Sequence, residues 1–125
     1  MELMDLLLER NLQQTKEIVI PGELAEHKFV IRALNSQEWN NNRKQCMNIT
    51  KNSVDLDQGK LNALNVLAAC VVPNFRDAGF ISRAGVTLPI DLVYKVLKPG
   101  EIEKLANAIL EYSGFGAELE EIPKK

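Results

Sequence analysis

Hydrophobic residues recur at helical spacing near both ends of the chain. Leu6 and Leu7 follow Leu3 at intervals of three and four residues, which predicts a short, strongly apolar helix within residues 1–10. Near the other end, the same rule is met by Ile102, Leu105, Ala106, Ile109 and Leu110. A helix as short as the first is unstable in isolation, so we expect its apolar face to pack against another surface.

Between residues 16 and 34 the pattern changes to the alternation that is typical of β-strands. A first strand over Lys16–Ile20 is interrupted by Pro21-Gly22. A second strand over His27–Leu34 places Phe29 and Ile31 on one face. The connection between them is short, so we predict an antiparallel β-hairpin over residues 16–34.

Helical spacing returns after the second strand. Asn35 followed by Glu38 resembles a capping box and predicts a mostly polar helix that begins at Asn35 or Ser36 and ends near Thr50. The buried side of this helix is predicted to carry Trp39, Cys46 and Met47.

A strongly apolar central helix is predicted after a polar turn from Asn52 to Gly59. Asp57 is the expected N-cap of this helix, and Pro73 ends it. Its buried face is predicted to consist of Leu61, Leu64, Leu67, Ala68 and Val71, widened by Val66, Cys70 and Val72.

The segment 74–88 contains two glycines and predicts an irregular connection with one extended turn at Phe80-Ile81. Pro89 suits the first turn of a further helix, and Pro99 begins the last one. Gly114 is the expected left-handed C-cap of that last helix, after which Phe115 folds back on its final turn.

These elements predict one α+β domain that is mainly α-helical. We expect a single compact domain over residues 1–115, in which the β-hairpin of residues 16–34 packs against about four helices, most of them within residues 35–115. The segment 116–125 is acidic and ends in two lysines, which predicts a flexible tail.

Composition narrows the possible partners. The 125 residues include 15 Lys and Arg against 17 Asp and Glu, a net charge of −2 that is spread evenly over both halves. Nucleic-acid or membrane binding needs clustered basic residues, so we expect neither partner. The longest apolar run, Val66 to Pro73, is too short to span a bilayer. Cys46 and Cys70 are interpreted as buried thiols in a reducing, cytoplasmic environment.

Candidate chemistry is sparse. The single histidine, His27, lies beside a presumed turn, and no Cys, His or carboxylate cluster has the spacing of a metal site. Both cysteines fall on apolar helical faces, where burial disfavours the reactive thiolate. We therefore predict no catalytic, cofactor-binding or metal-binding residues, and no enzymatic activity.

Surface for protein partners remains the main functional hypothesis. The stripe of Leu3, Leu6 and Leu7 either closes the core of its own domain or docks on a partner or a second copy. Aromatic residues in polar or loop surroundings either pack locally or act as binding anchors. They are Trp39, Phe75 and Phe80.

The succession of these segments resembles the small tail assembly chaperones encoded by tailed bacteriophages and by prophages of Gram-positive bacteria. The likeness covers about Met1 to Phe115 and is most specific at a Pro-Gly-Glu-Ile step that leads through a helix to Ser-Gly-Phe. It is carried by Phe29–Leu34, Glu38, Cys70–Phe75, Gly85–Pro89, Leu97–Ile102 and Ser113–Phe115.

The resemblance implies a non-enzymatic role in tail morphogenesis. Such proteins bind the long helical tape measure protein in the host cytoplasm and keep it soluble until the tail tube forms, and they are absent from the finished virion. A compact domain with a surplus apolar helix is compatible with that role, because exposed apolar stripes aggregate unless they are covered. The resemblance therefore implies the tape measure protein as partner, with a homo-oligomer also considered.

Three alternatives stay open at this point. A DNA-binding regulator would use the helices around 61–72 and 88–113 as a helix-turn-helix, although phosphate contacts need more clustered basic residues than the sequence has. An uncharacterised intracellular protein-interaction module is the second alternative. A small enzyme ranks last, because no nucleophile–base pair is visible.

Overall fold

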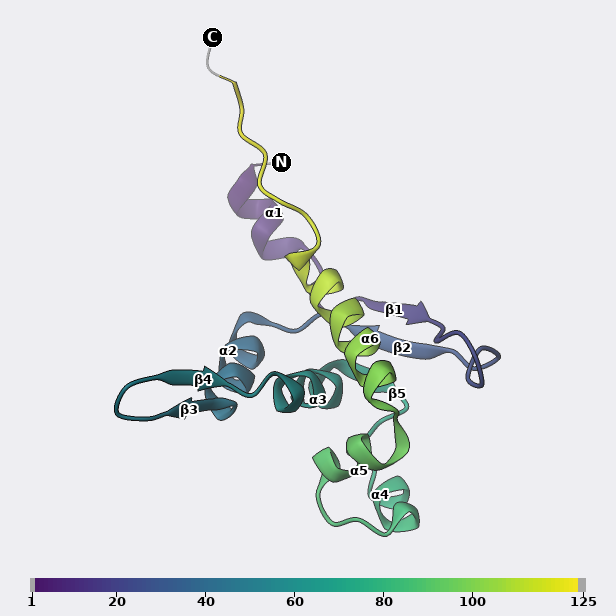
Figure 1. Ribbon diagram of the computed structural model, residues 1–125. Coiled ribbons are helices and arrows are strands. Elements are labelled where there is room, and N and C mark those ends of the chain that lie inside the picture. The colour runs from purple at the N-terminus through teal and green to yellow at the C-terminus, as the bar shows by residue number, and fades with distance from the viewer. Residues whose placement is uncertain (1, 124–125) are drawn as a thin grey trace.

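The structure is a computed structural model that describes residues 2–123. Its helices and strands follow one another as α1 (Leu3–Glu9), β1 (Thr15–Ile18), β2 (Phe29–Arg32), α2 (Ser36–Gln45), β3 (Met47–Ile49), β4 (Val54–Leu56), α3 (Gln58–Ala69), β5 (Cys70–Val72), α4 (Ala78–Ala84), α5 (Pro89–Val96), α6 (Pro99–Leu110) and a wide helical turn, η1 (Glu111–Phe115). Figure 1 shows α6 running through the middle of the molecule. The predicted α+β class with mainly helical content is confirmed.

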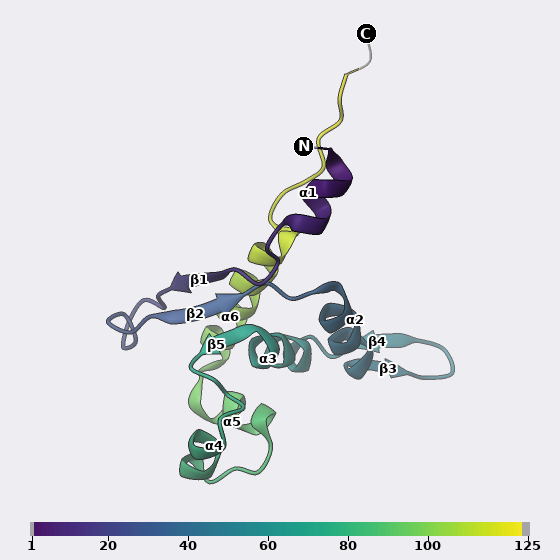
Figure 2. The same ribbon diagram turned by 180° about the vertical axis from the view of Figure 1, so that it is seen from behind.

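A three-stranded antiparallel sheet with the order β1-β2-β5 forms one side of the core. β2 lies in the middle, and its side chains alternate, so that Phe29 and Ile31 are buried while Val30 and Arg32 are half-buried. Figures 1 and 2 show that α6 crosses this sheet. Apolar side chains of β2 therefore pack toward the helices.

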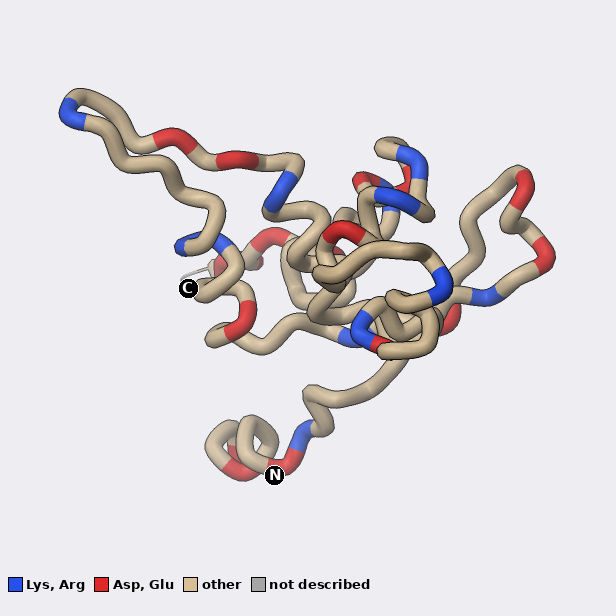
Figure 3. Tube along the Cα trace, turned by 90° about the horizontal axis from the view of Figure 1, so that it is seen from below, with Lys and Arg blue, Asp and Glu red and all other residues tan. Residues whose placement is uncertain are grey.

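Helix α3 is the centre of the hydrophobic core. It packs against α2, α5 and α6, and Ala63, Val66 and Ala69 on it are completely buried. A buried polar contact also links α3 to α2, because the Asn42 Nδ2 donates a hydrogen bond of 3.0 Å to the Asn65 Oδ1. Basic and acidic residues are interspersed along the chain (Figure 3).

An ion pair fixes α2 against the sheet and α3. The Arg32 guanidinium on β2 donates two hydrogen bonds, of 2.8 and 2.7 Å, to the two carboxylate oxygens of Glu38 on α2. The same guanidinium donates to the Ala68 carbonyl of α3 at 2.7 Å. Such paired hydrogen bonds have a fixed geometry, so the first turn of α2 has a defined position.

The Arg32–Glu38 pair predicts a pH-dependent part of the stability. The hydrogen bonds that the Glu38 carboxylate accepts from Arg32 hold the pKa of this carboxyl below its ordinary value. A carboxyl with a lowered folded-state pKa contributes stability above its unfolded pKa of about 4.3, and that contribution is lost as the pH falls through the folded-state value. Glu38→Gln is expected to be less stable than the parent at pH 7.

Urea unfolding at a series of pH values measures that difference directly. Glutamine keeps the capping-box hydrogen bond to the Asn35 N–H, for which the Glu38 Oε1 distance is 3.1 Å. Its amide NH2 cannot accept from Arg32, so the variant removes the charge together with one of the two hydrogen bonds of the pair. The gap between the two proteins should narrow as the pH falls below about 4. An unchanged gap from neutral to acidic pH would contradict the role of the ion pair.

Several predicted elements are confirmed with their end signals. The Asn35 side chain accepts from the Glu38 N–H as part of a full capping box, and Asp57 caps α3 by accepting from the Lys60 N–H. Pro89 and Pro99 lie in the first turns of α5 and α6. The apolar helix predicted within residues 1–10 is α1, which begins at Leu3.

Other expectations were wrong. α2 ends at Gln45, and Met47 belongs to β3, which pairs with β4 where a polar turn was predicted. The central helix ends at Ala69, because the next residues form β5 and pair with β2, which leaves Val71 and Val72 exposed. The segment 74–88, predicted to be irregular, contains α4.

The element count also differs from the prediction. Residues 2–123 contain six α-helices rather than about four, and β5 extends the paired β1 and β2 into a three-stranded sheet. Residues 117–123 have no helix or strand and are exposed, and the last two residues of the predicted tail lie outside the described part of the chain.

Candidate protein-interaction surface

The leucine stripe of α1 is exposed to solvent. Leu3 is 68% exposed, Leu6 51% and Leu7 50%, and α1 contributes no residue to the hydrophobic core. Figures 1 and 2 both show α1 standing away from the body of the molecule, on the same side as the segment that follows η1. The stripe therefore does not close the core of its own domain in this structure.

The polar side of α1 is acidic. Glu2, Asp5 and Glu9 lie on or next to the helix, and Asp5 is in its first turn, where a negative charge is favourable. Residues 10–14, which join α1 to β1, are exposed and form no regular element. α1 is thus a short amphipathic helix, set apart from the body, with leucines on one side and acids on the other.

Trp39 lies on α2 in an aromatic and cationic cluster. Its ring stacks on that of Phe115 with 5.7 Å between the centroids and 27° between the planes. The Arg43 guanidinium lies 4.9 Å from the Trp39 ring centroid, within the range of a cation–π contact. Trp39 is half-buried, and Phe115 is mostly exposed.

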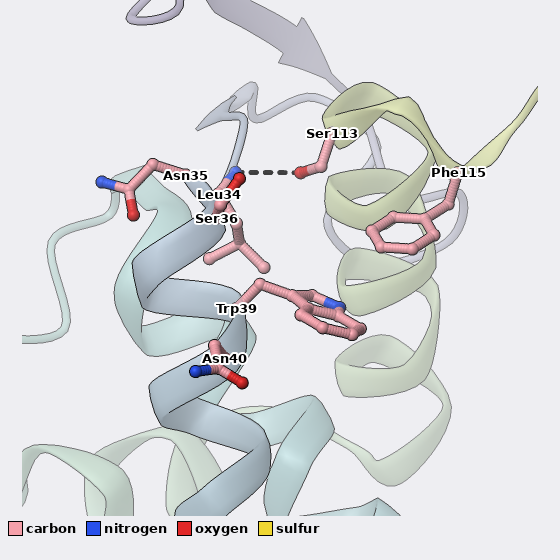
Figure 4. Close-up of a pocket in the computed structure, with 7 residues that line it drawn as sticks. All are labelled: Leu34, Asn35, Ser36, Trp39, Asn40, Ser113 and Phe115. Atoms are coloured by element: carbon pink, nitrogen blue, oxygen red, sulfur yellow. Dashed lines mark hydrogen bonds between the residues drawn. The ribbon is translucent and has the colours of Figure 1, made fainter.

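A pocket of about 440 Å³ opens beside this aromatic pair. Figure 4 shows Trp39 and Phe115 approaching it from different elements, α2 and the turn after α6. The pocket is lined by Leu34, Asn35, Ser36, Trp39, Asn40, Ser113 and Phe115. It therefore combines aromatic walls with several polar groups, a mixture typical of binding surfaces.

The wall formed by Phe115 depends on the turn before it. Ser113 Oγ donates to the Ile109 carbonyl at 2.6 Å and accepts from the Leu34 N–H at 2.9 Å, which ties the end of α6 to the start of α2. Gly114 follows with φ of 104°, a conformation that side chains rarely tolerate. The predicted left-handed conformation of Gly114 is confirmed, but its predicted place as C-cap is wrong, because Glu111 caps α6 and Gly114 lies within η1. The Phe115 ring, expected to fold back on the last turn, stacks on Trp39 of α2.

Phe75 and Phe80 are packed together away from this pocket. Phe75 is 1% exposed and belongs to the hydrophobic core, and the half-buried Phe80 stacks on it with 5.9 Å between the ring centroids. A side chain as buried as Phe75 offers a partner no surface. We therefore leave Phe75 out of the contact surface proposed below, because local packing accounts for its position.

One apolar surface escaped the sequence analysis. β3 and β4 form a second, two-stranded sheet on which Ile49 is 77% and Val54 60% exposed. The signal was present as alternation on either side of a Lys51-Asn52-Ser53 turn. It was missed because the helical spacing of α2 was extended through Met47 to Thr50.

Neither cysteine has the lowered pKa of a reactive thiol. Burial raises the pKa of the Cys70 thiol to about 12, and it also raises the pKa of Cys46, so both favour the unreactive protonated form. Within residues 2–123, no three His, Cys, Asp or Glu side chains are grouped to hold a metal ion. The same residues include no helix of the length and apolar content needed to cross a membrane.

Comparison with known proteins places the chain in a family. The sequence profile of the phage XkdN-like tail assembly chaperone proteins matches residues 4–124. The crystal structure of the protein YqbN is similar in fold, with a TM-score of 0.60 and 19% identity over 82% of this chain and 87% of that one. Curated proteins yield no match. Because the profile matches nearly the whole chain, the protein belongs to the XkdN-like family of phage tail assembly chaperones.

Proposed function

We propose that this chaperone binds the tape measure protein in the host cytoplasm, without enzymatic activity, and that it is absent from the mature virion. The observation that carries the proposal is the solvent-exposed leucine stripe of α1 on a member of a tail assembly chaperone family. A chaperone needs apolar surface that is available to a client, and α1 supplies it without disturbing the core.

The physical basis is the covering of apolar helical stripes. A long helical protein with an exposed apolar face aggregates in water unless that face is covered. An amphipathic helix covers such a face by laying its own apolar side against it. The acidic polar side of α1 then faces water and keeps the complex soluble.

We assign the partner contact to five exposed or half-buried side chains. They are Leu3, Leu6, Leu7, Trp39 and Phe80. The α1 leucines also have the chemistry for self-association, so a homo-oligomer is the second use that we consider for them. Lys and Arg are interspersed with Asp and Glu along the chain (Figure 3), which supports a protein partner over nucleic acid or a lipid surface.

Co-purification tests the proposed partner. The affinity-tagged chaperone, expressed together with the tape measure protein from the same phage or prophage, is expected to retain that protein through gel filtration. Mass spectrometry of purified virions is expected to detect the tape measure protein but not the chaperone. Failure to retain the tape measure protein, or chaperone present in virions in comparable amount, would refute the proposal.

A further inference from the structure

The β3–β4 sheet carries an apolar face that the rest of the fold leaves exposed. Antiparallel pairing places Met47 opposite Leu56 and Ile49 opposite Val54. Alternate residues of a strand lie on the same face, so these two pairs lie side by side. We call this the hairpin face, and it consists of Met47, Ile49, Val54 and Leu56. Between the two pairs, Asn48 and Asp55 point to the opposite face.

This face is open to solvent. Ile49 is 77%, Val54 60% and Met47 40% exposed, while Leu56 is half-buried. Figures 1 and 2 show the two strands projecting from the body beside α2. A two-stranded sheet is marginally stable in water and gains stability when another layer covers its apolar side. The hairpin face thus has the properties of a docking surface.

The basic charge near the hairpin face favours a partner with acidic groups. Residues 43–60 contain four basic and two acidic side chains, a local net charge of +2 in a chain whose net charge is −2. Both acids are directed elsewhere, because Asp55 points to the opposite face and Asp57 caps α3. Among the bases, Arg43 lies over the Trp39 ring and Lys60 donates to the Gln45 carbonyl, which leaves the exposed Lys44 and Lys51 as the charged groups available to a partner. A partner with acidic groups beside its apolar residues is therefore favoured over a basic one.

The dimensions suit a single helix. Strands of three residues are about 10 Å long and lie about 5 Å apart, and an α-helix with its side chains is about 10 Å wide. About two turns of one helix therefore cover the hairpin face. An added strand would pair with an edge of the sheet and leave the four apolar side chains exposed.

We propose that the hairpin face binds an amphipathic helix of the tape measure protein whose apolar stripe is flanked by Asp or Glu. This inference rests on the proposed function and adds a second contact surface, distinct from α1, with a stated preference among client segments. The α1 of a second copy has similar chemistry and is the competing occupant that the experiment distinguishes.

The test uses the full-length chaperone and overlapping synthetic peptides that span the tape measure protein. Each peptide has about 30 residues, long enough to form a helix on binding. Peptides with an apolar stripe flanked by acids are expected to bind most tightly. Ile49→Lys is expected to weaken that binding by at least about tenfold, because it places a charge within the apolar contact at the most exposed residue of the face.

Two further variants make the result specific. Asn48→Lys adds the same charge to the same strand on the opposite face, and it should leave binding within about twofold of the parent. Lys44→Glu combined with Lys51→Glu leaves the apolar face intact, and it should weaken binding most at low salt. Circular dichroism melts check that all three variants stay folded.

The outcomes separate this inference from the proposed function. If the tape measure protein co-purifies but Ile49→Lys binds its peptides as the parent does, the hairpin face is not the site, although the proposed function stands. If Ile49→Lys changes only self-association in sedimentation experiments, the occupant is a second copy and the inference fails. If the parent protein does not retain the tape measure protein at all, the proposed function itself fails.

Discussion

Replacing Leu67 with alanine is expected to lower the free energy of unfolding by about 2–5 kcal/mol. Leu67 lies on α3, is 7% exposed and belongs to the core formed with α5 and α6. Alanine at this position loses the transfer free energy of the removed atoms and leaves a cavity that the neighbouring helices only partly fill. Since domains of this size are stable by about 5–15 kcal/mol, the loss is a large share of the total.

Urea unfolding followed by circular dichroism measures this loss as a lower midpoint at an unchanged slope. Leu119→Ala is the matched control, because Leu119 is fully exposed and its substitution should change stability by less than about 0.5 kcal/mol. A loss below about 1 kcal/mol for Leu67→Ala would mean that α3 is not the centre of the core.

Replacing both Leu3 and Leu7 with glutamate is expected to weaken partner binding by about a hundredfold or more. Each leucine buried at an interface contributes about 1.5–3 kcal/mol, and 1.4 kcal/mol corresponds to tenfold in affinity. Both side chains are half or more exposed in the free protein, so glutamate removes little packing from the domain itself. The thermal midpoint should therefore stay close to that of the parent.

The measurement is the dissociation constant for the tape measure protein, together with a thermal melt of each variant. Leu119→Glu, the same substitution at a leucine that is fully exposed, should leave binding unchanged. If the double variant unfolds, the leucines pack within their own domain and the contact surface is misplaced. If it stays folded and binds as the parent does, α1 is not a contact helix.

Local end signals made a large part of the fold predictable. Asn35 and Glu38 form the full capping box that the sequence indicated, and Asp57 caps α3. Pro89 and Pro99 begin their helices as expected. These signals work because each cap satisfies N–H groups within one turn and needs no distant partner.

The wrong predictions concern elements that depend on distant pairing or on a cap that the sequence analysis did not recognise. The residues of β5 continue the helical spacing of α3, and pairing with β2 decides their conformation. β3 is a strand because it pairs with β4 across a polar turn. α4 did have a local signal, since Asp77 accepts from the Phe80 N–H, but the sequence analysis followed Gly79 and Gly85 and did not recognise this cap.

Only part of the candidate surface was predictable, because the position of a side chain on it also depends on residues that are distant in the sequence. The exposure of α1 decides between two uses that its sequence left open, because a leucine stripe has the same pattern in a core and on a surface. Trp39 was named from its polar surroundings, but its partner Phe115 is far away in the sequence. The Gly114 turn and the Ser113 hydrogen bonds bring that ring to α2.

The solubility of the tape measure protein tests the chaperone function most directly. The tape measure protein is expressed alone, with the parent chaperone, and with the Leu3→Glu, Leu7→Glu variant, and its soluble fraction is measured after centrifugation. We expect it to be soluble only with the parent chaperone, because only that protein offers an intact apolar stripe on α1. Equal solubility in all three cases would contradict the proposal that this protein keeps its client soluble by covering apolar surface.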